Sequence, residues 1–113
     1  MPSATPKVSI GLPVYNGENY LAETIESILN QSFTDFELII CDNASTDKTP
    51  SIVSKYAAQD VRIRVNRSDV NIGAAGNFNW TFELASGAYF KWAAHDDLIA
   101  PTFLARCLEV MEN

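Results

Sequence analysis

The chain alternates between short continuous apolar runs and segments in which apolar residues recur every three or four positions. The runs at 8–15, 36–42 and 88–94 are rich in β-branched or aromatic residues, as in strands buried on both faces. Segment 61–67 alternates apolar with polar residues, which is typical of a strand with one exposed face near a sheet edge. The pattern therefore predicts about four strands.

A segment with helical character follows each of these strands. The first spans 18–31, with Asn16 expected as its N-cap. Further helices are expected up to about Ala58, over 77–86 and after Pro101. Four aromatic residues, two in the helix over 77–86 and two in the strand at 88–94, are expected in the core: Trp80, Phe82, Phe90 and Trp92. This order predicts an α/β fold, a Rossmann-like parallel sheet in a three-layer sandwich with flanking helices.

Length and composition fit a single domain over residues 1–113. Hydrophobic residues make up 47% of the 113 residues and charged residues 19%, which is typical of a globular chain. The net charge of -6 gives no electrostatic reason to expect a nucleic acid or an anionic membrane as partner. No apolar run approaches the roughly 20 residues of a membrane span.

The cysteines and the first residues bear on location. Cys41 and Cys107 lie in apolar contexts and form no CxxC pair, so two buried free thiols are expected. Such thiols favour a reducing compartment, and the first residues lack the basic and apolar segments of a signal peptide. A cytoplasmic location is therefore expected.

Polar residues follow three of the predicted strands. In a parallel α/β sheet, ligands bind outside the carboxyl ends of the strands. The residues at those ends are Tyr15, Asn16, Asp42, Asn43, His95, Asp96 and Asp97. Groups from separate parts of the chain are therefore expected to converge at one edge of the sheet, which makes this edge the candidate site.

Each candidate also has a structural interpretation, and the residues alone leave both open. Asp96 and Asp97 either hold Mg²⁺ or Mn²⁺, which favour oxygen ligands, or simply precede a helix in solvent. Asp42 either bonds a base or ribose or caps the next helix. Tyr15 either stacks on an aromatic base or fills the core. A lone histidine is more often structural, but His95 flanks an aspartate pair and has better prospects of touching a ligand.

Three motifs that would define other classes are absent from the sequence. It has no GxGxxG after the first strand, no GxxxxGK[ST] and no GxSxG. Dinucleotide-binding Rossmann proteins, P-loop kinases and ATPases, and α/β-hydrolases are therefore disfavoured.

Three segments, in this order, resemble the nucleotide-binding half of a family 2 glycosyltransferase with the GT-A fold. They are "VSIGLPVYNGENYLAETIESILNQSFTDFELIICDNASTD", "NIGAAGNFNWTFELASGAYFKWAAHDD" and "LIAPTFL", and they cover roughly residues 7 to 105. The resemblance implies a partial GT-A fold that binds a nucleotide-diphosphate sugar. It further implies transfer of the sugar to an acceptor hydroxyl of a saccharide or lipid-linked saccharide, in polysaccharide or glycoconjugate synthesis.

The resemblance assigns a nucleotide site. The segment that matches the lining of the nucleoside pocket comprises Pro13, Tyr15, Asn16 and Glu18. Asp42 and Asn43 stand where the family commonly carries two aspartates, the second of which contacts the base. Asn43 departs from that pattern, because an amide both donates and accepts while a carboxylate only accepts. Uridine, deoxythymidine and guanosine therefore stay open as the nucleoside.

The resemblance also implies a metal site. The family usually shows Asp-x-Asp followed by another Asp, whereas this chain has Ala94, His95, Asp96 and Asp97. Asp96 is expected as the principal ligand of Mg²⁺ or Mn²⁺ beside the nucleotide phosphates, with Asp97 in support. In the family the metal stabilises the leaving nucleoside diphosphate and the anomeric centre is usually inverted. The general base is expected beyond residue 113, so the chain is expected to be a truncated donor-binding half that is inactive alone.

Two other functions compete with this one. A non-catalytic α/β binding module would differ from it in lacking metal-dependent binding of a nucleotide diphosphate. A sugar nucleotidyltransferase would need a glycine-rich, basic loop after the first strand, which "PVYNGEN" does not provide. A homodimer is expected through surface exposed by truncation. For the full-length protein, the inner membrane face stays open as a location.

Overall fold

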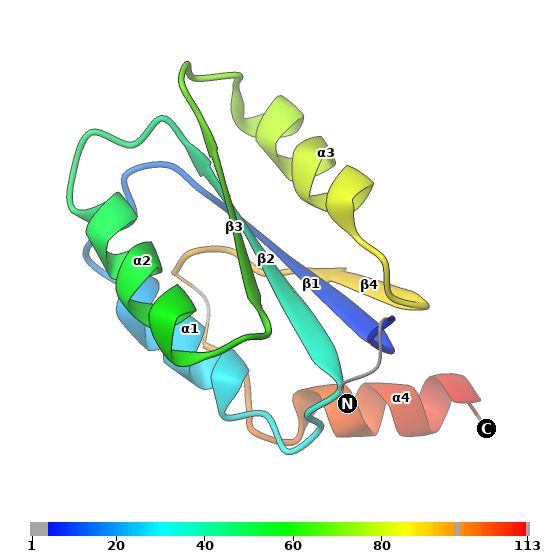
Figure 1. The fold of residues 1–113 in the computed structure, drawn as a ribbon. Coiled ribbons are helices and arrows are strands. Elements are labelled where there is room, and N and C mark those ends of the chain that lie inside the picture. The colour runs from blue at the N-terminus through cyan, green and yellow to red at the C-terminus, as the bar shows by residue number, and fades with distance from the viewer. Residues whose placement is uncertain (1–4, 97, 113) are drawn as a thin grey trace.

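The computed structural model describes residues 5–96 and 98–112, and within them strands and helices alternate along the chain (Figure 1). The elements are β1 (Val8–Val14), α1 (Leu21–Leu29), β2 (Phe36–Asn43), α2 (Thr49–Gln59), β3 (Ile63–Ser68), α3 (Ala74–Leu84), β4 (Tyr89–Trp92) and α4 (Phe103–Glu112). The four strands form one sheet in the order β3-β2-β1-β4, with all neighbours parallel. The predicted α/β fold is confirmed, and β3 lies at an edge as its alternating pattern indicated.

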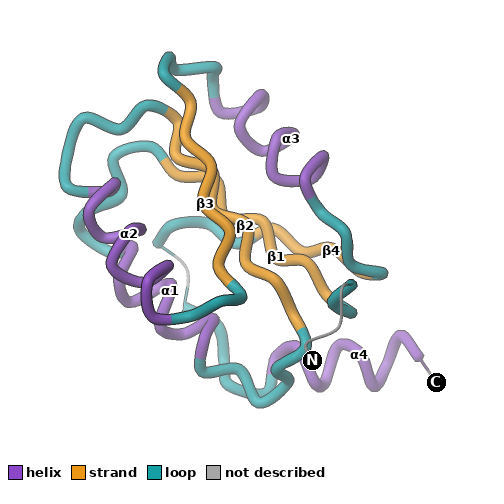
Figure 2. The backbone as a smooth tube through the Cα atoms, viewed as in Figure 1, coloured by secondary structure: helices purple, strands orange, loops and turns teal. Residues whose placement is uncertain are grey.

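The elements form three layers. Figures 1 and 2 show α1 and α2 together on one side of the sheet and α3 on the other, while α4 lies near the end of the sheet where β1 begins. Because all strands are parallel, their carboxyl ends lie at one edge of the sheet and their amino ends at the opposite edge.

The main core lies between the sheet and helices α1, α2 and α4. Alternate residues of β1 and β2 supply its sheet side: Val8, Ile10, Leu12, Val14, Phe36, Leu38 and Ile40. The first helix contributes Leu21, Ile25 and Ile28, which recur at helical spacing on one face. On α4, the buried residues are Leu104 and Leu108, one helical turn apart on a single face.

Helix α3 has the reverse of the expected polarity. Its buried residues are Asn77 and Thr81, whereas Phe78 and Phe82 are 39% and 56% exposed. Small residues allow this close packing: a Cβ on Gly11 of β1 would lie 2.6 Å from the Thr81 hydroxyl oxygen. The prediction that Phe82 and Trp92 fill the core is therefore wrong, and Trp92 is 44% exposed.

The displaced rings gather on the surface instead. Phe82 and Phe90 make an edge contact at 5.1 Å, as do Phe90 and Trp92, and Phe78 lies 5.9 Å from Trp92. We call these four residues, which come from α3 and the edge strand β4, the aromatic patch. The Trp92 indole donates to the Phe78 carbonyl and to the Thr81 hydroxyl, which fixes the patch to α3.

A buried polar network joins the strands at their amino ends. One oxygen of Glu37 accepts from the Ser9 hydroxyl at 2.6 Å and from the Ser86 amide and hydroxyl at 2.8 Å each. The other oxygen accepts from the Arg64 guanidinium at 2.8 Å. Gly87 packs against β1, where an added Cβ would lie 2.8 Å from the Ser9 nitrogen. The network therefore ties β1, β2 and β3 to the entry of β4.

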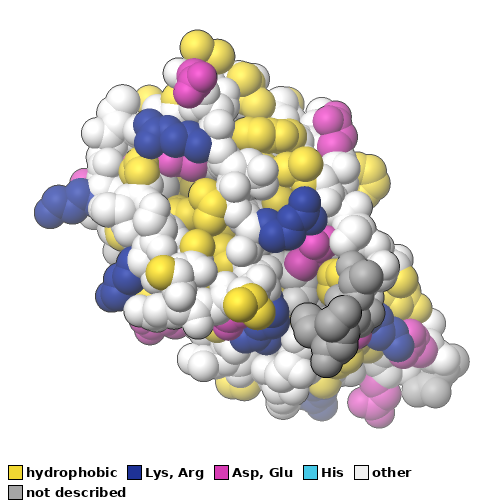
Figure 3. All heavy atoms as spheres, viewed as in Figure 1, with side chains coloured by type: hydrophobic (Ala, Val, Ile, Leu, Met, Phe, Trp, Pro, Cys, Tyr) yellow, Lys and Arg dark blue, Asp and Glu magenta, His cyan; other side chains and the backbone are white. Residues whose placement is uncertain are grey.

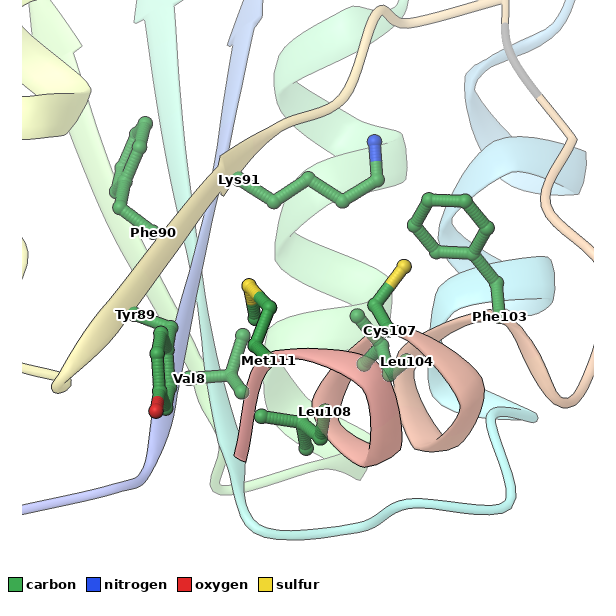
Figure 4. A pocket seen from close by; sticks show the side chains of 9 residues that line it. All are labelled: Val8, Tyr89, Phe90, Lys91, Phe103, Leu104, Cys107, Leu108 and Met111. Atoms are coloured by element: carbon green, nitrogen blue, oxygen red, sulfur yellow. The ribbon is translucent and has the colours of Figure 1, made fainter. Parts of the chain in front are cut away.

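A hollow of about 230 Å³ lies between β4 and α4 (Figure 4). Its lining is almost entirely apolar, with Phe103, Leu104, Cys107, Leu108 and Met111 facing Val8, Tyr89 and the stem of Lys91. Phe90 also borders the hollow, but its ring points away from α4 and packs against Phe82 of α3. It contains none of the predicted site residues. The Lys91 ammonium lies 5.0 Å from the centre of the Phe103 ring, at the rim of this hollow.

The surface and the helices bear on possible partners. On the face shown in Figure 3, basic and acidic side chains are interspersed with apolar ones, and no basic patch dominates. Across the portion of the chain that the structure describes, every helix is too short or too polar to cross a bilayer.

Candidate functional site

A pocket of about 150 Å³ opens at the carboxyl ends of the strands, against the first turns of α3. Its lining residues are Pro13, Val14, Tyr15, Asn43, Ala74, Asn77, Phe78 and His95. The carboxyl ends of β1 and β2 and the segment after β4 therefore contribute Tyr15, Asn43 and His95. The sequence predicted that these residues would converge at one edge of the sheet. Asn16, Glu18, Asp42 and Asp96 do not line the pocket.

Asn43 shapes the pocket through its amide. Its Nδ2 donates to the Asn71 side-chain oxygen at 3.0 Å and to the Gly73 carbonyl at 3.3 Å. Its Oδ1 accepts from the Ile72 amide at 2.8 Å. Both ends of this side chain are thus engaged in holding the loop that leads into α3, and Asn43 itself is 2% exposed.

Asp42 points away from Asn43, because successive strand residues face opposite sides of a sheet. Its Oδ1 accepts from the Ser45 amide at 3.0 Å, so the carboxylate closes the turn after β2. Its Oδ2 is buried and has no hydrogen-bond partner among the residues that the structure describes. Asp42 therefore does not cap α2, which begins at Thr49: one oxygen closes the turn after β2, and the other keeps a buried acceptor without a described partner.

The loop after β1 is joined to the loop after β2. Asn16 adopts a left-handed conformation with φ 51° and its side-chain oxygen accepts from the Thr46 amide at 2.8 Å. Glu18 donates its amide to Asp47 at 3.2 Å, and its carboxylate accepts from the Lys48 amide at 3.4 Å. The expected N-cap role of Asn16 is therefore wrong, since α1 begins only at Leu21.

Asp47 anchors this junction. Burial raises the pKa of its carboxyl, but hydrogen bonds from Thr49 and from the Glu18 amide outweigh burial and hold the pKa below its ordinary value. The carboxylate also accepts from the Thr49 amide at 2.9 Å, at the start of α2. Asn16 and Glu18 thus support the pocket wall from behind Tyr15, whose ring is 46% exposed.

Two polar atoms at the pocket have no partner. The Oδ1 of Asn77 and the Nδ1 of His95 are buried and make no hydrogen bond with any described residue. Asn77 escaped the sequence reasoning because a polar residue in an amphipathic helix is normally expected on the solvent side. The available signal was its position beside the small residues 73–76, which let a helix approach a sheet closely.

The expected metal ligands are only partly described. Asp96 follows β4 and is exposed, and its carboxylate joins none of the ion pairs formed within residues 5–96 and 98–112. Asp97 lies outside the described residues. Elsewhere in the chain, the described histidine, cysteine, aspartate and glutamate side chains form no group of three that could hold a metal ion. Asp96 fits a site that relies on a ligand's phosphate oxygens and on water for its remaining coordination.

Solved structures with the same arrangement of strands and helices include two that are described in complex with nucleotide sugars. The S. aureus TarS fragment 1-349 in complex with UDP-GlcNAc superimposes with a TM-score of 0.87 at 29% identity, over 94% of this chain and 31% of that fragment. Mannosyltransferase PcManGT from Pyrobaculum calidifontis, in complex with GDP-Man and Mn²⁺, gives a TM-score of 0.86 at 26% identity, over 99% of this chain and 34% of that one.

The sequence comparison narrows this class to one family. The family model described as glycosyl transferase family 2 matches residues 9–113, and the chain belongs to this family. The putative glycosyltransferase EpsE of Bacillus subtilis is 42% identical over 96% of the chain, and chondroitin synthase of Escherichia coli is 37% identical over 92%. The chain spans 39% of the length of EpsE and 15% of the length of chondroitin synthase.

Proposed function

We propose that this chain is the donor-binding part of a glycosyltransferase, which binds a nucleotide-diphosphate sugar for transfer to an acceptor hydroxyl. The observation that carries the proposal is the pocket at the carboxyl ends of β1, β2 and β4, with Tyr15, Asn43 and His95 in its wall. Family membership supports it, as do the UDP-GlcNAc and GDP-Man complexes of two similar structures. EpsE and chondroitin synthase support a role in polysaccharide or glycoconjugate synthesis.

The pocket residues have distinct parts in donor binding. The half-exposed Tyr15 offers a stacking surface for the base, and the buried Pro13 adds a rigid part of the pocket wall. Asn16 and Glu18 hold this wall through the loop after β2. Asn43 fixes the loop that leads into α3, and Asp42 fixes the turn after β2. A donor hydroxyl would bond the unpartnered Asp42 oxygen only by reaching past the pocket lining, because this oxygen is buried outside it.

We also propose that Asp96 helps to hold Mg²⁺ or Mn²⁺ together with the donor phosphates, with Asp97 in support. The exposed, unpaired Asp96 carboxylate at a strand end suits this role, and PcManGT is described in complex with Mn²⁺. When bound, the ion supplies Lewis-acid stabilisation of the leaving nucleoside diphosphate. We propose inversion at the anomeric carbon and assign the general base to no described residue.

Titration calorimetry of UDP, dTDP and GDP, each with and without Mn²⁺, tests this function on wild-type chain, Asp96→Ala and Asp60→Ala. The Asp60 control removes a carboxylate that pairs with Arg62, away from the pocket. We expect metal-dependent binding of at least one nucleotide, lost in Asp96→Ala and retained in Asp60→Ala. If a nucleotide binds with the same affinity with and without Mn²⁺, and equally well to the wild type and Asp96→Ala, a non-catalytic binding module is favoured.

We further propose that the chain self-associates through the aromatic patch and the open edge of β4. Exposed rings beside a strand with one free edge favour pairing between copies. Light scattering at tens of micromolar should show a dimer in the wild type and a monomer in Phe82→Glu.

The free cysteines Cys41 and Cys107 support a reducing, cytoplasmic setting, and burial raises the pKa of Cys41 to about 12, so its thiol is unreactive.

A further inference from the structure

The amide of Asn77 is held in one orientation. Its Nδ2 donates to the Cys41 carbonyl of β2 at 3.0 Å, and because a carbonyl only accepts, the donor end of the amide must face β2. The acceptor end, Oδ1, is consequently fixed as well. Asn77 is 3% exposed and lines the pocket, and no described residue donates to this oxygen. The pocket therefore carries a buried acceptor of defined polarity to which no described residue donates.

His95 brings a second unpartnered atom to the same pocket. Its backbone is fixed because the Thr24 hydroxyl of α1 donates to the His95 carbonyl at 2.9 Å. Its ring is placed by packing, since a Cβ on Gly17 would lie 3.0 Å from Nδ1. The Nδ1 atom is buried and makes no hydrogen bond with the described part of the chain. A neutral imidazole nitrogen either donates or accepts, so this atom adapts to the ligand group opposite it.

Asn43 cannot supply these contacts without breaking others. Its Oδ1 and Nδ2 both hold the loop from Asn71 to Gly73, and this loop starts α3 and so positions Asn77. Within the lining of the pocket, the acceptor left free on the α3 side is Asn77 Oδ1. The free acceptor at the pocket therefore belongs to Asn77 of α3, the helix packed on the sheet, and not to Asn43 at the end of β2.

The size of the pocket indicates which part of a ligand enters it. A volume of about 150 Å³ corresponds to roughly five water molecules. That space accepts a single planar ring system but not a whole nucleotide sugar. The half-exposed rings of Tyr15 and Phe78 belong to the lining, which is otherwise apolar apart from Asn43, Asn77 and His95. A flat heterocycle with a polar edge fits this combination.

We propose that Asn77 and His95 read the hydrogen-bonding edge of the donor's base, with Asn77 as a fixed acceptor and His95 as an adaptable partner. This inference rests on the proposed function, because it takes the ligand to be a nucleotide. It assigns base selection to Asn77, a residue of α3, in place of Asn43. A base that presents an N–H to Asn77 binds, and one that presents a lone pair there is rejected.

The test compares base preference in three chains by calorimetry with UDP, dTDP, GDP, CDP and ADP in the presence of Mn²⁺. Asn77→Ala removes the acceptor, and Asn79→Ala is the matched control, an exposed asparagine on the same helix. We expect Asn77→Ala to weaken the best nucleotide by about three- to tenfold and to narrow the range of affinities across the bases. Asn79→Ala should leave every affinity unchanged.

The outcomes separate this inference from the proposed function. If the wild type binds none of the five nucleotides, the proposed function fails and this inference fails with it. If the wild type binds but Asn77→Ala keeps the same affinities and order, this inference alone is overturned.

A ligand-side measurement covers the case in which Asn77→Ala does not fold after losing its bond to Cys41. The best nucleotide is then compared, on wild-type chain, with its derivative methylated at the ring N–H or amino group. Weakening of about tenfold supports the contact. Equal binding of the two overturns it.

Discussion

At the amino ends of the strands both oxygens of Glu37 have partners, whereas at the carboxyl ends Asp42, Asn77 and His95 each keep a buried atom without one. The two edges belong to the same four-stranded sheet. A buried polar group without a partner costs free energy, so a satisfied network stabilises the fold, whereas an unsatisfied group is a candidate contact for a ligand. Asn66, in register with Cys41 of β2, carries a fourth unpartnered atom for which the structure gives no explanation.

The largest expected effect comes from breaking the satisfied edge. Glu37→Ala should lower the free energy of unfolding by about 3 kcal/mol, because Ser9, Ser86 and Arg64 lose a shared buried acceptor. Urea denaturation followed by circular dichroism measures the loss. Lys7→Ala is the control, since its ion pair with Glu112 is open to solvent and should matter little. Equal losses in the two variants would mean that the Glu37 network contributes no more than a surface pair.

A smaller effect of opposite sign is expected at the unsatisfied edge. Asp42→Asn should raise the free energy of unfolding by about 1 kcal/mol, because an amide is cheaper to bury without a partner than a carboxylate. Its Oδ1 still accepts from the Ser45 amide. The same variant should bind nucleotide more weakly. Asp35→Asn, at an exposed site, is the control and should change neither the free energy of unfolding nor the nucleotide affinity. Reduced stability in Asp42→Asn would show that this edge is structural like the other.

The smallest effect is a pH dependence of the satisfied edge. Burial raises the pKa of Glu37, but hydrogen bonds from Ser9, Ser86 and Arg64 outweigh it and leave the pKa below its ordinary value of 4.5. A carboxyl with a lowered folded pKa stabilises the fold above its ordinary pKa, and this contribution is lost as the pH falls through the lowered value.

Urea titrations from about pH 5 downward should therefore show the wild type losing stability faster than Glu37→Gln. Asp47 and Asp60, whose pKa values are also lowered, titrate in both chains and cancel in the difference. If the free energies of unfolding of the wild type and Glu37→Gln fall in parallel with pH, Glu37 does not cause the loss of stability in acid.

Sequence patterns were sufficient for the fold because the main core follows them. The β-branched runs became the strands, and Leu21, Ile25 and Ile28 face the core at helical spacing. Parallel pairing then brought Tyr15, Asn43 and His95 to one edge, as expected from the rule that parallel strands share their carboxyl edge.

The errors arose where tertiary packing overrides local pattern. Apolar spacing cannot tell whether a second layer covers a helix face, so Phe82 was expected inside although Asn77 and Thr81 are the buried residues of α3. Asn16 looks like an N-cap in isolation, but its partner is Thr46, thirty residues away in the chain. Such long-range hydrogen bonds leave no periodic trace in a single sequence.

The joined loops after β1 and β2 have a kinetic consequence. Because Asn16, Glu18 and Asp47 already hold the pocket wall in the free chain, a ligand meets a surface that needs little ordering on arrival. Association should then proceed at a rate that is similar for different bases, with no slow step for loop closure. The preference among nucleotides should appear instead in how long each one stays bound, that is, in the dissociation rate constant.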